Sequence, residues 1–168
     1  MLQKKICMLG AYGVGKTSLV RRFVESIFDE KYHTTLGVKI DKRVMEIGDT
    51  RFTLVLWDLA GDDEVEQANL SHLRGASGYI LVVDGCRKST LDRAVLLKQR
   101  VDQVLGPVAA VLALNKCDIN DQWAVTPAMV EEIFAHHMPV FVTSAKTGHA
   151  VEEMFQALAI QTLGETTR

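Results

Sequence analysis

The sequence predicts a doubly wound α/β fold, in which helices cover both faces of a mostly parallel, six-stranded sheet. Short apolar segments alternate with segments of helical periodicity along the chain. Two of the apolar segments, residues 78–84 and 108–115, are nearly free of polar side chains, as expected for parallel strands buried on both faces. The length of 168 residues suits a single domain, residues 1–168, with a sizeable core.

The individual elements follow from periodicity and turn signals. The expected strands are residues 5–10, 37–47, 52–58, 78–84, 108–115 and 139–143. The second and third form an antiparallel hairpin around Gly48-Asp49. The expected helices are residues 16–27, 90–104, 128–137 and 149–163. Ligands of such sheets bind at the carboxyl ends of the strands, so we expect the chemistry at residues 10–17, 58–62, 115–118 and 143–146.

Composition excludes several function classes. The net charge of −2 gives no general attraction to nucleic acid or to an anionic membrane. The three cysteines lack metal-ligand spacing, and they fit a reducing cytosol better than a disulfide framework. The first apolar run is too short for a signal peptide or a membrane span. Leu2 excludes N-myristoylation, and no cysteine follows Cys117, so we expect a cytoplasmic protein without a lipid anchor in the chain as given.

A phosphate-binding pattern stands between the first strand and the first helix. Residues 10–17 read Gly-Ala-Tyr-Gly-Val-Gly-Lys-Thr and match G-x-x-x-x-G-K-[ST], the signature of P-loop NTPases. Glycines let backbone N–H groups point at an anion, and the helix adds its positive N-terminal dipole. Lys16 is expected on the β- and γ-phosphates and the Thr17 hydroxyl on Mg²⁺. A glycine-rich turn without a ligand is the alternative. The residues expected around the phosphates are Tyr12, Gly13, Val14, Gly15, Lys16, Thr17 and Ser18.

Guanine is indicated by Asn115-Lys116-Cys117-Asp118, at the end of a strand. The Asp118 carboxylate can accept hydrogen bonds from both N1–H and the N2 amine of guanine. Adenine offers no donor there and would leave a buried charge unpaired. The Lys116 stem can lie along the base, and Asn115 can tie neighbouring loops together. Taken alone, the tetrapeptide is equally consistent with a polar turn.

In their order and spacing these motifs resemble those of the Ras superfamily of small GTPases, over essentially the whole chain. The resemblance implies GTP or GDP with Mg²⁺ as ligands, and guanine O6 bound by the backbone of a motif at Ser144, Ala145 and Lys146. It places the ring of Phe28 beside the base, where core packing is the alternative. The missing lipid signal would suit a prokaryotic member.

The resemblance also implies two switch loops, residues 30–38 and 60–75, which would bind effector and regulator proteins. Tyr32 and Thr35 fall in the first switch, and Asp58-Leu59-Ala60-Gly61 opens the second. Thr35 would ligate Mg²⁺ in the triphosphate state, Asp58 would hold a metal-bound water, and the Gly61 N–H would touch the γ-phosphate. The catalytic groups expected on this basis are Lys16, Thr35, Gly61 and Asp62.

Two positions depart from the family pattern. The glutamine that usually follows D-x-x-G and orients the attacking water is Asp62 here. Tyr12 stands where relatives have a small residue, in the path of an arginine finger. Both departures could be family drift without consequence. The sequence therefore predicts a GTP/GDP switch with slow hydrolysis, and the alternative is a nucleotide-locked module that stays GTP-bound and recruits partners. An ATP-dependent kinase or ATPase is disfavoured by Asp118 and residues 144–146.

Overall fold

A computed structural model describes residues 1–25, 33–35, 38–59, 71–134 and 137–165, with residues 33–35 described by their backbone alone. One sheet runs through the molecule, with its strands in the order β2-β3-β4-β1-β5-β6-β7. The strands are β1 (Leu2–Leu9), β2 (His33–Thr35), β3 (Val38–Ile47), β4 (Thr50–Leu59), β5 (Gly78–Asp84), β6 (Ala109–Asn115) and β7 (Val140–Val142).

The pairing of the strands confirms the doubly wound, mostly parallel sheet. Strand β1 pairs in parallel with β4 and β5, and β6 pairs in parallel with β5 and β7. Strand β3 is antiparallel to β2 and β4, and Ile47 faces Thr50 across the predicted hairpin turn. All six expected strands are present. The additional β2 has three residues and no apolar alternation, so only its pairing with β3 identifies it.

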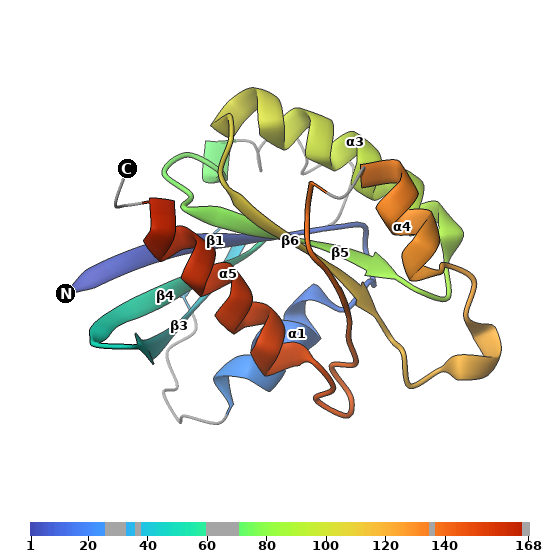
Figure 1. The fold of residues 1–168 in the computed structure, drawn as a ribbon, viewed down its shortest axis with the longest axis horizontal. Helices are drawn as coiled ribbons and strands as arrows, with labels where there is room; N and C mark the ends of the chain where they lie inside the picture. Colours follow the sequence, from blue (N-terminus) through green and yellow to red (C-terminus); the bar gives the residue numbers. More distant parts are fainter. Residues whose placement is uncertain (26–32, 36–37, 60–70, 135–136, 166–168) are drawn as a thin grey trace.

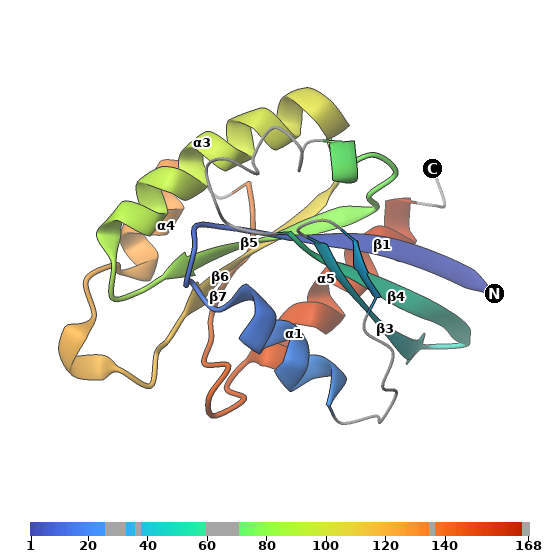
Figure 2. The same cartoon turned by 180° about the vertical axis from the view of Figure 1, so that it is seen from behind.

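Helices cover both faces of the sheet (Figure 1). The helices are α1 (Lys16–Val24), α3 (Lys88–Leu105), α4 (Pro127–Phe134) and α5 (Val151–Glu165), with a 3₁₀ turn η2 at Asn120–Gln122. Helices α1 and α5 lie on one face and α3 and α4 on the other, as the view from behind also shows (Figure 2). The expected start of the last helix at residue 149 was wrong, because Ala150 has φ of 56° and so lies outside the helical region. The ends expected for α1 and α4 fall partly outside the described residues.

Two apolar clusters fill the space between the sheet and its helices. One lies under α1 and α5 and the other under α3 and α4. In the first, the rings of Phe23 and Phe155 stack with centroids 4.0 Å apart, which joins α1 to α5. This packing fixes α1, and with it the loop that precedes the helix. None of the helices in the described ranges combines the length and apolar character that crossing a bilayer requires.

Candidate functional site

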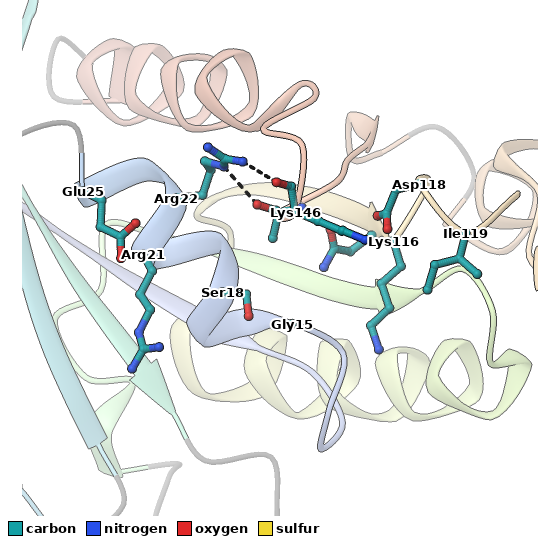
Figure 3. A pocket seen from close by; sticks show the side chains of 11 residues that line it. Gly15, Ser18, Arg21, Arg22, Glu25, Lys116, Asp118, Ile119 and Lys146 are labelled. Carbon is teal, nitrogen blue, oxygen red and sulfur yellow. Dashed lines mark hydrogen bonds between the residues drawn. The ribbon is translucent and has the colours of Figure 1, made fainter.

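A cavity of about 580 Å³ opens at the carboxyl edge of the sheet, where three polar loops meet. Gly15 and Ser18 line it from the start of α1, Asp118 from the loop after β6, and Lys146 from the loop after β7 (Figure 3). These segments lie far apart in the sequence, and the sheet brings their ends to one edge. All three motif-bearing loops therefore border one cavity.

The loop of residues 10–15 lies tightly against its neighbours. A Cβ on Gly10 would lie 2.5 Å from the Val82 carbonyl oxygen, and a Cβ on Gly15 would meet the Asn115 side-chain amide. Gly15 also has φ of 104°, which L side chains rarely adopt. Only glycine fits either position. The close approach places the loop backbone beside the ends of β5 and β6.

Lys16 is 7% exposed, and its ammonium lies inside this loop. Its Nζ donates to the carbonyls of Gly10, at 2.8 Å, and Ala11, at 3.2 Å. Burial lowers the pKa of Lys16 to about 8, although the charge of Asp58 acts in the opposite direction. A buried cation enclosed by a loop can bind an anionic ligand such as phosphate, which would compensate its desolvation.

Two oxygen ligands of the kind that Mg²⁺ prefers meet beside the loop. Thr17 Oγ1 donates to Asp58 Oδ2 over 2.5 Å, from the first turn of α1 to the end of β4. Burial raises the pKa of Asp58, while the hydrogen bond from Thr17 and the charge of Lys16 lower it. A hydroxyl and a carboxylate fit a hard cation that completes its shell with water and phosphate oxygens.

Asn115 joins the loops of the site and is 2% exposed. Its Nδ2 donates to the Val14 carbonyl at 3.0 Å. Its Oδ1 accepts from Thr143 Oγ1 at 3.1 Å and from the Ala145 N–H at 3.3 Å. One buried amide thus connects the phosphate-binding pattern to both loops that carry the guanine motifs, and fixes their spacing.

Asp118, which lines the cavity, is in contact with the buried Ser144. Ser144 Oγ donates to Asp118 Oδ1 at 2.7 Å, which orients the carboxylate. Arg22 of α1 donates from Nε to the Ala145 carbonyl at 3.0 Å and from Nη2 to the Lys146 carbonyl (Figure 3). Arg22 therefore fixes the backbone of this loop from the side of α1. The sequence did not indicate Arg22, because a single arginine on a helix carries no pattern.

An ionic cluster that the sequence did not indicate lies behind the phosphate loop. Asp84 ends β5, is 2% exposed, and pairs with Lys116 Nζ at 2.8 Å and Arg87 Nε at 2.9 Å. Burial alone would raise the pKa of Asp84, but hydrogen bonds from Lys116, the Cys86 N–H and Arg87 lower it below its usual value. An aspartate closing an apolar strand at the carboxyl edge was the signal that could have found it.

The same cluster holds the outer side of the phosphate loop. Lys116 Nζ donates to the Gly13 carbonyl at 2.8 Å, and Arg87 Nη2 donates to the Tyr12 carbonyl at 2.7 Å. The Tyr12 side chain itself is 81% exposed. The main chain of Tyr12 is therefore fixed by a cation, while the residue stays largely exposed.

Trp123 has a structural role that the sequence did not indicate. A Cβ on Gly85 would collide with the Trp123 ring, and the N–H groups of Ala124 and Val125 donate to the Gly85 carbonyl at 2.7 and 3.0 Å. Trp123 therefore covers the loop after β5, next to the Asp84 cluster.

Several predicted site residues lie outside the described part of the chain. These are Phe28, Tyr32, Gly61 and Asp62, with much of the two switch loops. Thr35 ends β2, and its side chain is not described. Val14 is fully buried in the core under α1. The structure thus brings together the residues of the phosphate loop, Asp58 and the two guanine motifs.

Known proteins match the chain along most of its length. The model of the Ras family matches residues 5–163. The human Ras-related protein Rab-32 is 32% identical over 157 residues, which cover 89% of this chain and 70% of Rab-32. Rab-13 of Rattus norvegicus is 33% identical over 164 residues, covering 96% of this chain and 81% of the relative. Rab-1C of Dictyostelium discoideum is 33% identical over 158 residues, which cover 92% of this chain and 78% of Rab-1C. The chain belongs to the Ras family of small GTPases.

Proposed function

We propose that this chain cycles between GTP and GDP as a Mg²⁺-dependent molecular switch. The observation that carries the proposal is the meeting of three groups at one edge of the sheet, where Asn115 joins the phosphate loop to the guanine motifs. These groups are the buried Lys16 in its loop, the Thr17–Asp58 pair, and the Asp118–Ser144 pair. The first suits phosphates, the second a divalent cation, and the third the guanine edge. A guanine nucleotide lying along the cavity would engage all three.

In this proposal the phosphates occupy the loop of residues 10–15, and backbone N–H groups of residues 13–18 bind them. Lys16 exchanges its loop carbonyls for phosphate oxygens, which relieves the cost of a buried charge. Asp118 accepts from guanine N1–H and N2, while Ser144 keeps the carboxylate oriented. The ordering of the site by Asn115 and Arg22 lowers the entropy lost on binding.

We assign Mg²⁺ to Thr17 and Asp58, with Thr35 joining in the triphosphate state. The cation would neutralise charge that develops on the phosphates during transfer. Thr17 lies in the first turn of α1, outside both switch loops, and contacts Asp58, so we expect it to bind the cation in both nucleotide states. Thr35 lies within the first switch, so its contact with the metal would depend on the γ-phosphate.

Separate substitutions test this division of roles. Thr17→Ala removes a ligand in both nucleotide states, so GDP should dissociate roughly ten- to a hundredfold faster in the presence of Mg²⁺. Thr35→Ala should leave GDP dissociation within about twofold of wild type and weaken binding of a GTP-selective partner. Dissociation of a fluorescent GDP analogue, measured with Mg²⁺ and with a chelator, distinguishes them. Equal acceleration of GDP release by both variants would contradict the assignment.

We further propose that hydrolysis is slow. Asp62 places a negative charge where the usual glutamine orients water, and it reaches one methylene less far. Tyr12 would leave little room for an arginine from a partner, since it is a large, exposed residue of the phosphate loop and its carbonyl already binds Arg87. The alternative of a nucleotide-locked module is favoured by the same two residues. A slow switch and a locked module would each give a resting state in which most of the protein is bound to GTP.

Single-turnover hydrolysis decides between a slow switch and a locked module. Asp62→Gln should raise the rate of phosphate release from preloaded GTP by roughly tenfold, if water positioning limits the reaction. Tyr12→Gly should help chiefly when an arginine donor is present. Matched GTP loading of each variant serves as the control. A wild type faster than Asp62→Gln would show that Asp62 itself positions water, and the locked module would then be abandoned.

The remaining assignments concern the setting of the switch. We propose that effectors and regulators bind the loops of residues 30–38 and 60–75, as the switch mechanism requires, and that the protein acts in the cytoplasm. Strand β2 supports the first assignment, because it extends the edge of the sheet directly at the first of these loops.

A further inference from the structure

Two opposite charges lie on the face of β3 that borders the metal ligand Asp58. In the β3–β4 ladder Lys39 is directly opposite Asp58. Directly opposed side chains in an antiparallel pair leave the sheet on the same face, with Cβ atoms about 5 Å apart. Asp41 lies two residues further along β3, on the same face as Lys39. Lys39 and Asp41 are therefore neighbours of the proposed metal site without being among its proposed ligands.

The two side chains are close to one another and poorly exposed. Lys39 Nζ lies 3.9 Å from Asp41 Oδ2, and the side chains are 20% and 9% exposed, respectively. The next charge on this face, Arg43, is engaged elsewhere, because it forms two hydrogen bonds with Glu152 at 2.7 and 2.8 Å. Lys39 and Asp41 are thus the charges of this strand that act on the site.

Their effect reaches the Asp58 carboxylate in opposite directions. Burial has the largest effect on the pKa of Asp58, followed by the hydrogen bond from Thr17 and the charge of Lys16. After these, the positive charge of Lys39 lowers this pKa and the negative charge of Asp41 raises it. Interactions between poorly exposed charges are weakly screened by salt. A divalent cation beside Asp58 would feel the same two charges, with repulsion from Lys39 and attraction to Asp41.

We propose that Lys39 and Asp41 set the Mg²⁺ affinity of the nucleotide site, Lys39 weakening it and Asp41 strengthening it. The inference rests on the proposed Mg²⁺-dependent binding of guanine nucleotide. Its consequence is kinetic: nucleotide release becomes sensitive to the free Mg²⁺ concentration over a range that these two residues determine. Lys39 in this way favours spontaneous exchange.

The test measures the Mg²⁺ concentration that half-maximally slows dissociation of a fluorescent GDP analogue. Lys39→Met should lower this concentration by roughly three- to tenfold, and Asp41→Asn should raise it by a similar factor. Lys39→Arg keeps the charge and should behave as wild type. The matched control is Lys42→Met, which removes an equal charge from an exposed side chain on the opposite face of the same strand and should cause no shift.

The opposite signs separate electrostatics from damage to the fold. A loss of packing would weaken Mg²⁺ retention in both variants, whereas the proposed effect tightens it in Lys39→Met. Shifts in one common direction, or no shift, would overturn the inference while leaving the proposed function intact. If the wild type releases GDP equally fast with Mg²⁺ and with a chelator, the metal assignment itself fails.

Discussion

Asp118→Asn is expected to lower GTP affinity by roughly a hundredfold and to shift preference toward xanthosine triphosphate. The carboxylate would accept two hydrogen bonds from guanine, and hydrogen bonds to a charged group contribute about 1.5–3 kcal/mol each. An asparagine offers one acceptor and a donor, so its N–H₂ would face the guanine N2 amine. Xanthine presents a carbonyl oxygen at that place, which the same N–H₂ can bind. Competition titrations with the two nucleotides measure both changes.

The control for this variant is Asp121→Asn. Asp121 is exposed in η2, three residues further along the same loop, and its replacement changes the net charge equally. GTP affinity should stay within about twofold of wild type, because exposed charges at a distance are screened. An unchanged GTP affinity in Asp118→Asn would remove Asp118 from the base-binding site, and an equal loss in Asp121→Asn would make the effect one of general charge.

The sequence could predict the loops of the site because their chemistry is local. The glycine spacing of residues 10–15 and the tetrapeptide Asn115–Asp118 each carry their role within a few consecutive residues, directly after an apolar strand. The doubly wound sheet then requires that strand ends meet at one edge. Fold and loop positions therefore followed from periodicity and motif together.

The supporting charges could not be predicted, because each acts through contacts between distant segments. Arg22 reaches the loop after β7 across more than a hundred residues of sequence, and Arg87 reaches Tyr12 across 75. Neither arginine belongs to a local sequence motif that would indicate its contact with the site. The pairing of Lys39 with Asp58 is likewise a consequence of the β3–β4 register, which hydrophobic alternation alone leaves open where charges interrupt the strand.

Gly15→Ala is expected to cause the second large loss, at least a hundredfold in nucleotide affinity. Its φ of 104° costs an L residue about 1–2 kcal/mol. The added methyl would also strike the Asn115 amide. That amide cannot simply move aside, since it donates to the Val14 carbonyl and accepts from Thr143 and Ala145. Breaking these buried hydrogen bonds would leave polar groups unpaired, at about 1–3 kcal/mol each.

Gly48→Ala separates backbone strain from the collision in Gly15→Ala. Gly48 also has a positive φ, of 57°, but nothing lies within 4 Å of an added Cβ, and the residue stands in the β3–β4 turn. Gly48→Ala should therefore lower the free energy of unfolding by about 1 kcal/mol and leave nucleotide affinity unchanged. Thermal unfolding and nucleotide titration of both variants make the comparison. If Gly15→Ala binds nucleotide as tightly as Gly48→Ala, the contact between the phosphate loop and Asn115 does not order the site, and the role assigned to Asn115 in fixing the spacing of the loops fails.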